Sequence, residues 1–149
     1  MAAGLGDDAA ALAGLGLEVV AFDAAPSAVQ WARRRHLDVD VTWQVADLFA
    51  LPDDWRAAFD LVVEVFTVQS IAPGRQIAAV EAIRRTVSPG GVLLAVAITV
   101  ADSEEPSGPP WPLRPPVVDA LLDGLLPRSR HDEELSPGVT AVRLELERP

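Results

Sequence analysis

The chain contains no cysteine and no lysine, and these two absences exclude several kinds of chemistry. Without cysteine there is no disulfide framework, no thiolate zinc site and no cysteine nucleophile. Without lysine, a P-loop NTPase, Schiff-base catalysis and a lysine general base are all excluded. All 12 basic residues are therefore arginine, and the chemistry of the chain must rest on other side chains.

Long hydrophobic runs and a basic leader are also missing. The longest apolar run spans residues 92–101 and includes Thr99, whereas a membrane-spanning helix needs about 20 apolar residues. The start of the chain, MAAGLGDD, carries acids and no base, unlike the basic beginning of a secretory signal. The sequence therefore predicts a soluble, cytoplasmic domain with no membrane partner.

The composition indicates a folded and acidic protein. Of the 149 residues, 50% are hydrophobic and 23% are charged, which is enough apolar surface for a core in one domain over residues 1–149. The formal net charge is −10, so the chain would repel a nucleic-acid backbone. The oligomeric state is left open by these numbers.

The first half of the chain alternates between helical and strand patterns. The run DDAAALAGL is rich in alanine, and we expect Asp7 or Asp8 to cap the helix that it forms. Pro26 suits the first turn of a helix, and three arginines at the end of that helix complement its dipole. A later segment alternates apolar and polar residues, which is typical of an edge strand with one wet face. The predicted elements are a helix over 7–15, a strand over 17–23, a helix over 26–35 and a strand over 39–45.

The second half begins with two almost unbroken apolar runs, FDLVVEV and VLLAVA. Such runs are typical of strands buried on both faces, near the middle of a sheet. We therefore predict an α/β fold: a doubly wound, mostly parallel, Rossmann-like sheet with helices on both faces and an antiparallel C-terminal strand. Six prolines between Pro106 and Pro116 forbid regular structure there. The predicted elements are strands over 59–65 and 92–97, helices over 77–87 and 117–125, and closing strands over 126–135 and 142–146.

In such a sheet, ligands bind outside the carboxyl ends of the strands. The residues at these ends are Asp23, Asp47 with Leu48, and the segment from Glu64 to Phe66. A Gly-Leu-Gly turn at residues 4–6 precedes a helix and belongs to the same edge. Three acids without a base suit a ligand that offers hydroxyls, an amine or a positive charge, and suit a phosphate badly.

The order of these pieces resembles a known family. Gly-Leu-Gly is followed by VVAFD, VADLFALP, FDLVVEV and the turn SPGG before VLLAVA. This series, over about residues 2–100, resembles the class I, Rossmann-like S-adenosylmethionine-dependent methyltransferases. Among these, it looks most like the small-molecule, thiopurine-methyltransferase-like branch. The resemblance implies a transferase with S-adenosyl-L-methionine as cofactor and a small-molecule acceptor, residues 1–100 holding the cofactor and residues 101–149 completing the domain.

The resemblance also implies roles for single residues. Gly4 and Gly6 match the later glycines of the family's loop, where the backbone approaches the cofactor. Asp23, followed by Ala24, matches the acid that accepts hydrogen bonds from the ribose hydroxyls, and Asp47 matches the acid that receives the adenine amino group. The remaining matches are Leu48 beside the adenine ring, Glu64 and Val65 near the methionine moiety, and Phe66, Gln69 and Trp111 at the acceptor.

The sequence departs from the family pattern at its beginning. The hydrophobic first strand that precedes the glycines in the family has no counterpart, and Ala2 stands where the first glycine is common. We therefore hypothesise that Met1 is a misplaced start or the end of a truncation, and that methyl transfer by this form is impaired. An in-frame stop codon directly upstream of Met1 would contradict the hypothesis.

Other interpretations of the same residues stay open. Each strand-end acid could simply cap a turn, and Trp111 could pack under a rigid loop. The spacing of Gly4, Gly6 and Ala9 also fits a nicotinamide-dinucleotide domain, although two acids at that helix start oppose a pyrophosphate. A degenerate methyltransferase-like fold that binds a partner is a further alternative. We assign no catalytic residue and no metal site, and interpret His36 as a surface residue and His131 as the start of an acidic run.

Overall fold

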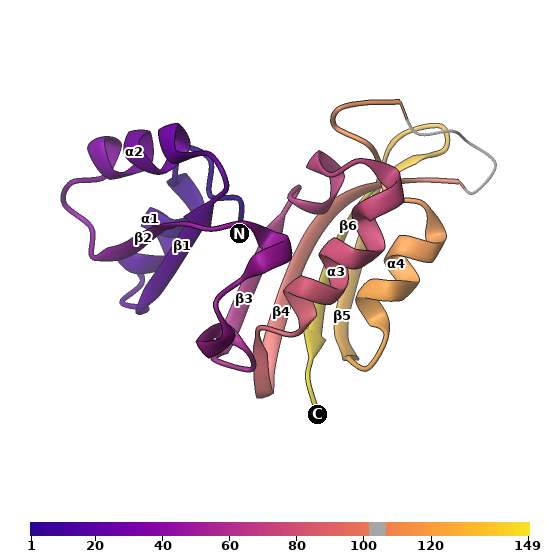
Figure 1. Cartoon of the computed structure of the whole chain (residues 1–149). Helices are drawn as coiled ribbons and strands as arrows, with labels where there is room; N and C mark the ends of the chain where they lie inside the picture. Colours follow the sequence, from indigo (N-terminus) through magenta and orange to yellow (C-terminus); the bar gives the residue numbers. More distant parts are fainter. Residues whose placement is uncertain (102–106) are drawn as a thin grey trace. The chain divides into compact units, whose positions relative to one another are not determined.

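The computed structural model describes residues 1–101 and 107–149. The chain divides into two compact units, residues 1–51 and residues 52–149 (Figure 1). Each unit contains its own sheet, so the described strands form two sheets where the sequence predicts one. No helix in the described ranges is both long and apolar enough to cross a bilayer.

The first unit is built on two parallel strands. These are β1 (Val19–Asp23) and β2 (Val41–Val45), paired in register from Val19 opposite Val41 to Asp23 opposite Val45. Helices α1 (Asp7–Gly14) and α2 (Pro26–Arg35) accompany them, followed by the short 3₁₀ turn η1 (Leu48–Ala50). The small core consists of Ala9, Ala21, Val29, Ala32 and Trp43.

The helix ends of this unit follow different rules. Helix α2 has the predicted bounds, with Pro26 in its first turn and three arginines in its last turn. Helix α1 is capped by Gly6, which has a φ of 85°, so the prediction that Asp7 or Asp8 is the N-cap is wrong. The two aspartates lie one and two positions later, in the first turn, where their charges interact favourably with the positive end of the helix dipole.

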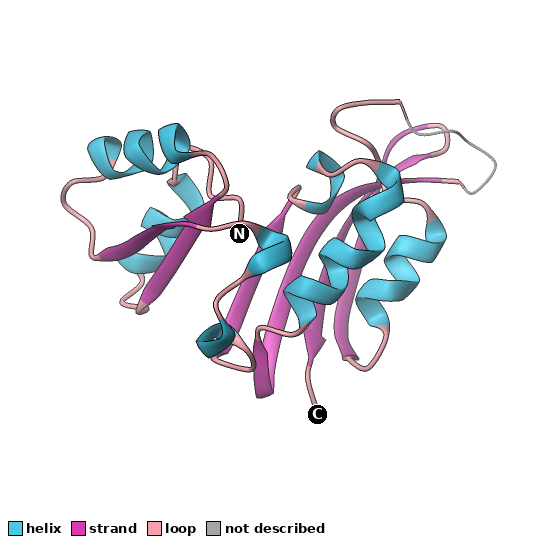
Figure 2. Ribbon diagram, in the orientation of Figure 1, coloured by secondary structure: helices cyan, strands magenta, loops and turns pink. Residues whose placement is uncertain are grey.

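The second unit is a four-stranded sheet in the order β3-β4-β6-β5. Strands β3 (Phe59–Val65) and β4 (Val87–Val100) are parallel, and β6 (Val139–Glu147) runs antiparallel to β4 and to β5 (Leu126–Ser136). Helices α3 (Gln76–Arg84) and α4 (Pro115–Leu122) lie side by side over the sheet (Figure 2). The short 3₁₀ turns are η2 (Asp53–Trp55), η3 (Val68–Ser70) and η4 (Pro73–Arg75).

This sheet confirms the α/β class with parallel strands and an antiparallel C-terminal pair, and it changes two details. Strand β4 is an inner strand as predicted, whereas β3 pairs only with β4 among the described residues. The expected turn at residues 88–91 lies within β4, as an irregularity at which the pairing jumps from Val87 to Val92 while β3 advances from Phe59 to Leu61. The glycines of this segment therefore form a bulge rather than a separate turn.

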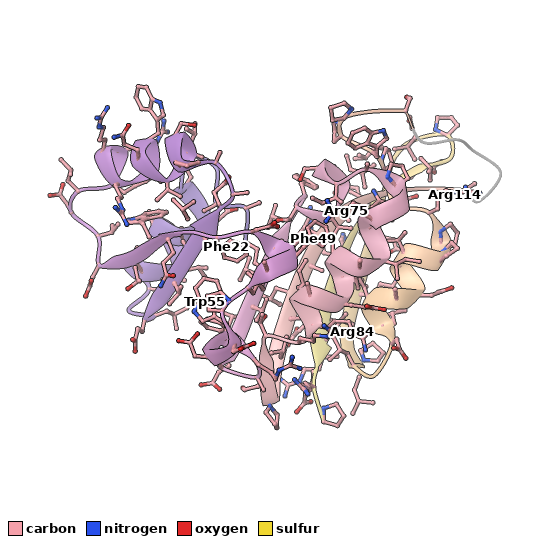
Figure 3. The ribbon with its side chains drawn as sticks, viewed as in Figure 1. Phe22, Phe49, Trp55, Arg75, Arg84 and Arg114 are labelled. Carbon is pink, nitrogen blue, oxygen red and sulfur yellow. The ribbon has the colours of Figure 1, made fainter. Side chains whose placement is uncertain are left out.

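The two helices of the second unit are joined by Arg84, near the end of α3 (Figure 3). Its guanidinium donates to the carbonyl of Ala120 at 3.0 Å and pairs with Asp123 at 3.1 Å. These groups are at the C-terminal end of α4, where a cation satisfies free carbonyls and the negative end of the dipole. Helix α4 starts earlier than predicted, because Pro115 and Pro116 fit the first helical turn, where no backbone donor is required.

Candidate functional site

The glycine turn before α1 contains two glycines with different constraints. A Cβ atom on Gly6 would lie 2.4 Å from the Trp43 ring and 2.9 Å from the Cβ of Ala32, and the φ of Gly6 is +85°. Gly6 is therefore required by packing inside the first unit. Gly4, with a φ of +53°, has open space on its Cα: the nearest atom to a Cβ there is the carbonyl oxygen of Ala2, at 4.0 Å. Only Gly4 leaves room for a ligand against the backbone.

Asp23 ends β1 beside this turn. Its Oδ2 accepts a hydrogen bond from the backbone N–H of Gly4 at 3.0 Å, and its Oδ1 accepts one from Ala25 at 2.9 Å. The N–H of Ala3 donates to the carbonyl of Phe22 at 2.8 Å, which holds the same turn against β1. Each carboxylate oxygen has two lone pairs, so Asp23 keeps acceptor capacity after orienting the glycine turn. Ala24 follows it in an exposed position.

Asp47 begins the turn after β2 in the same unit. Its Oδ1 accepts a hydrogen bond from the backbone N–H of Phe49 at 2.9 Å, so the side chain caps η1. Its side chain is exposed, and Leu48 beside it is 7% exposed and contributes to packing. The capping role expected of a strand-end acid is therefore present at Asp47. Because each carboxylate oxygen has two lone pairs, Asp47 keeps acceptor capacity after making this bond.

Glu64, near the end of β3, is the most unusual polar residue of the second unit. Its side chain is fully buried, and Oε1 accepts a hydrogen bond from the backbone N–H of Val68 at 3.0 Å. Its Oε2 is buried with no hydrogen-bond partner. Burial raises the pKa of this carboxyl, and the backbone donors Val68 and Thr67 oppose the rise without cancelling it. Glu64 is therefore not the solvated strand-end acid that its position alone would allow.

The chain leaves the sheet just after this acid. Phe66 has a φ of +57°, a left-handed conformation that strains any residue other than glycine, and its side chain is 44% exposed. Its backbone N–H donates to the carbonyl of Val96 on β4 at 3.0 Å, one residue beyond the end of β3. Val65 is partly buried directly before it. A strained backbone thus presents an apolar ring at the carboxyl end of β3.

Beyond that point, another part of the chain takes the place of β3 beside β4. The N–H of Leu113 donates to the carbonyl of Ile98 at 2.8 Å, and the N–H of Val100 donates to the carbonyl of Leu113 at 3.1 Å. Leu113 forms an isolated parallel bridge with Thr99, so the proline-rich segment contacts β4 at this one point. One donor of β4, the N–H of Ile98, falls between β3 and this bridge.

Gln69 fills that position. Its side chain is 3% exposed, and its Oε1 accepts from the N–H of Ile98 at 2.8 Å. Its carbonyl accepts from the N–H of Trp111 at 2.7 Å, and the carbonyl of Trp111 accepts from Nε2 of Gln76 at 3.2 Å. The backbone of Trp111 is therefore hydrogen-bonded through both its N–H and its carbonyl, and the N–H of Ile98 has a partner.

The structure brings the predicted residues together within each unit. In the first unit, Gly4 contacts Asp23 through a hydrogen bond, whereas Gly6 packs on Trp43. In the second unit, Gln69 and Trp111 share a hydrogen bond. Gln76 and Leu113 also hold the proline-rich segment in place, and the sequence pattern did not single them out. Neither residue carries a local signal, because their partners lie far away in the sequence.

These arrangements agree with a comparison of the sequence with models of protein families. Residues 1–91 match the model described as a methyltransferase domain, which is more than half of the chain. The chain belongs to the methyltransferase-domain family. No curated protein sequence matches it significantly. For this methyltransferase domain, the family is therefore established by the match to residues 1–91.

Solved structures confirm the fold of the methyltransferase domain. The cyclase SpnF is similar with a TM-score of 0.80 and 15% identity, over 99% of this chain and 72% of that chain. The N-methyltransferase NodS from Bradyrhizobium japonicum, in complex with S-adenosyl-L-homocysteine, has a TM-score of 0.75 and 17% identity, over 97% and 74% of the two chains. Geranyl diphosphate C-methyltransferase from Streptomyces coelicolor has a TM-score of 0.79 and 14% identity, over 99% and 69%. At these identities the likeness establishes the fold alone, and one of the three is a cyclase.

Proposed function

We propose that this methyltransferase domain transfers a methyl group from S-adenosyl-L-methionine to a small-molecule acceptor, with both units serving one domain. The observation that carries the proposal is the pairing of Asp23 with the open side of Gly4 at the carboxyl end of β1, in a chain that matches the family. Structural relatives crystallised with S-adenosyl-L-homocysteine support the choice of cofactor.

The residues of the first unit fit such a cofactor. Hydroxyl groups of a ribose would find free lone pairs on Asp23, and the backbone at Gly4 leaves room for a close approach. Asp47 and Leu48 would hold the adenine, one as an acceptor and the other as an apolar surface, with Ala24 next to the ribose. Because Gly6 is explained by its contact with Trp43, we assign it to the shape of the turn and only indirectly to cofactor binding.

The residues of the second unit fit the reacting end. Glu64 offers a buried, unpartnered oxygen, and Val65 and Phe66 follow it at the end of the strand. Gln69 is occupied by the backbone of β4, so its contribution to acceptor binding would be to hold Trp111, which is partly exposed. The acid-rich, lysine-free chain favours a cationic cofactor over a phosphate-bearing one.

The cofactor would supply an activated methyl group on a sulfonium, so the main task of the protein is to bind and align the two reactants. In the first unit, Asp23 orients the glycine turn at Gly4, and in the second unit the strained turn at Phe66 presents an apolar ring. The N–H and the carbonyl of Trp111 are both hydrogen-bonded, so this residue is fixed in place. Its side chain would form one side of the acceptor site.

Calorimetric titration tests the proposal directly. The chain should bind S-adenosyl-L-methionine and S-adenosyl-L-homocysteine saturably and should not bind NAD. Asp23→Ala should weaken this binding at least about tenfold, the equivalent of about 1.4 kcal/mol, while Asp38→Ala, an exposed aspartate of the same unit, serves as the control. Binding of NAD alone would refute the proposal in favour of a dinucleotide domain. Absence of all three complexes would favour a partner-binding module.

A further inference from the structure

His36, the residue directly after the last residue of α2, has contacts that a surface position does not explain. Its backbone N–H donates to the carbonyl of Ala32 at 3.0 Å. Its side chain is 16% exposed, so it is partly buried rather than the surface residue that we expected. The imidazole stacks on the ring of Trp43, with 6.3 Å between the ring centroids and an interplanar angle of 17°. Packing therefore fixes the orientation of the imidazole.

The Nε2 atom of this imidazole lies beside two oxygen atoms at the start of α1. It is 3.1 Å from the carbonyl oxygen of Leu5 and 3.3 Å from Oδ1 of Asp7. A carbonyl oxygen accepts hydrogen bonds and donates none, so Nε2 must carry the hydrogen. Asp7 also accepts from Nε of Arg35 at 3.2 Å, whereas His36 is the one donor to the Leu5 carbonyl among the described residues. The bond to Leu5 is therefore the contact that depends on the imidazole.

Leu5 is the central residue of the glycine turn, and His36 bonds this turn from a separate part of the chain. The N–H of Gly4 donates to the carboxylate that ends β1, and the N–H of Gly6 donates to the carbonyl of Ala3 at 2.8 Å. These bonds come from β1 and from the turn itself, whereas His36 lies 31 positions after Leu5. The turn is therefore held by β1 at its first residue and by the end of α2 at its second.

The end of α2 is itself fixed to β2 through Trp43. A guanidinium nitrogen of Arg33 donates to the carbonyl of Trp43, and the ring of Trp43 stacks on His36. The same ring approaches Gly6 so closely that a Cβ atom there would lie 2.4 Å from it. The turn, the imidazole and the indole thus form one packed cluster, in which Gly4 keeps an open side.

We propose, on the basis of the proposed function, that His36 is a positioning residue for cofactor binding. Its Nε2–H holds the carbonyl of Leu5 and so keeps the glycine turn in the shape in which the open side of Gly4 receives S-adenosyl-L-methionine. Without this donor the turn keeps its bonds to β1 but loses its link to α2, and it samples other shapes. The apparent affinity for the cofactor then falls by the fraction of chains that hold the competent shape.

Substitutions that differ in their donor separate this role from packing of the ring. His36→Gln keeps an N–H donor at nearly the reach of Nε2, His36→Asn carries the same amide one carbon nearer to the backbone, and His36→Leu has no donor. His131→Leu, at an exposed position on β5, is the matched control. Asp7→Asn keeps an oxygen acceptor and removes the charge, so it tests the ion pair alone.

Affinity is measured by calorimetry with S-adenosyl-L-homocysteine. We expect a loss of about fivefold in His36→Leu and His36→Asn, as for one lost hydrogen bond. The affinities of His36→Gln, Asp7→Asn and His131→Leu should stay within about twofold of the unsubstituted chain. In the chain without ligand, the amides of Gly4 and Gly6 should exchange faster in His36→Leu, while those of β1 and β2 keep their protection. NMR of the imidazole nitrogens should show the Nε2–H tautomer for His36.

Unchanged affinity in His36→Leu, or a loss that His36→Gln does not restore, would overturn the inference. Loss of protection throughout β1 and β2 would also overturn it, since His36 would then serve the stability of the whole unit. An equal loss of affinity in Asp7→Asn would assign the effect to the ion pair instead. If the unsubstituted chain binds no S-adenosyl-L-homocysteine, the proposed function is refuted, whereas the exchange measurements need no ligand and still decide whether His36 holds the turn.

Discussion

Replacing the two glycines of the N-terminal turn one at a time should separate stability from cofactor binding. In Gly6→Ala, the new Cβ would lie 2.4 Å from the Trp43 ring, which must then move. Trp43 is only 8% exposed and stacks on His36 with a ring-centroid distance of 6.3 Å, so little space is available. In Gly4→Ala, nothing lies closer than 4.0 Å to the new atom.

The magnitudes follow from these distances. Left-handed backbone costs a residue other than glycine about 1–2 kcal/mol, and this applies to both positions. Overpacking a filled core adds about 1–3 kcal/mol, and this applies only to Gly6. Gly6→Ala should therefore lower the free energy of unfolding of the first unit by about 2–5 kcal/mol, and Gly4→Ala by about 1–2 kcal/mol.

Hydrogen exchange of the amides in β1 and β2 measures the stability of this unit by itself. Calorimetry with S-adenosyl-L-homocysteine measures binding. We expect Gly4→Ala to lose the larger share of affinity, because its methyl group occupies the open side of the turn, while Gly6→Ala loses the larger share of exchange protection. Equal protection in the two variants, or greater loss in Gly4→Ala, would refute the assignment of Gly6 to packing.

Three further predictions follow. Asp23→Ala removes the acceptor of two backbone donors, so the amide of Gly4 should exchange faster in NMR, by an amount equivalent to about 1–3 kcal/mol; unchanged exchange would contradict the anchoring role. Gln69→Leu leaves the buried N–H of Ile98 unpaired and should cost about 1–3 kcal/mol in denaturant unfolding, which Gln69→Glu should partly restore. The pKa of Glu64 is raised above its ordinary value of 4.5 in the folded state. The stability of the unsubstituted chain, compared with that of Glu64→Gln, should therefore be highest below pH 4.5 and should fall as pH rises through the folded pKa. Thermal melts of both variants across this range check the sign, and a stability difference independent of pH would contradict it.

Local patterns predicted the elements whose causes are local. Helix α2 begins at Pro26 and ends after its arginines, as the sequence indicates, and β3 has the bounds of the run FDLVVEV. The alternation of Val142, Leu144 and Leu146 predicted β6, since these three side chains face the core at 1%, 3% and 0% exposure. In each case, neighbouring residues in the sequence carry the information.

The features that were not predicted depend on distant partners. The constraint on Gly6 comes from Trp43, and the role of Gln69 comes from a donor on β4 that neither β3 nor Leu113 reaches. The sequence pattern singled out the acids at the strand ends, but it did not predict the hydrogen bonds that they make. Asp47 caps a turn, and Glu64 is buried rather than solvated. Composition and spacing do not show whether a carboxylate meets a backbone donor or none.

The position of β6 determines when the second unit can finish folding during synthesis. Strand β6 lies between β4 and β5, although both of those strands leave the ribosome before it. Until residues 139–147 emerge, β4 is paired with β3 on one edge but has no partner on the other, and β5 has no partner at all among the described strands. The nascent chain must therefore carry unpaired strand edges until its last strand arrives, which is the stage at which aggregation competes with folding. Strands β5 and β6 are joined by ion pairs of Arg128 with Glu145 and Glu147, and of Arg143 with Glu133. These pairs would favour the correct register when β6 pairs with β5 at the end of synthesis.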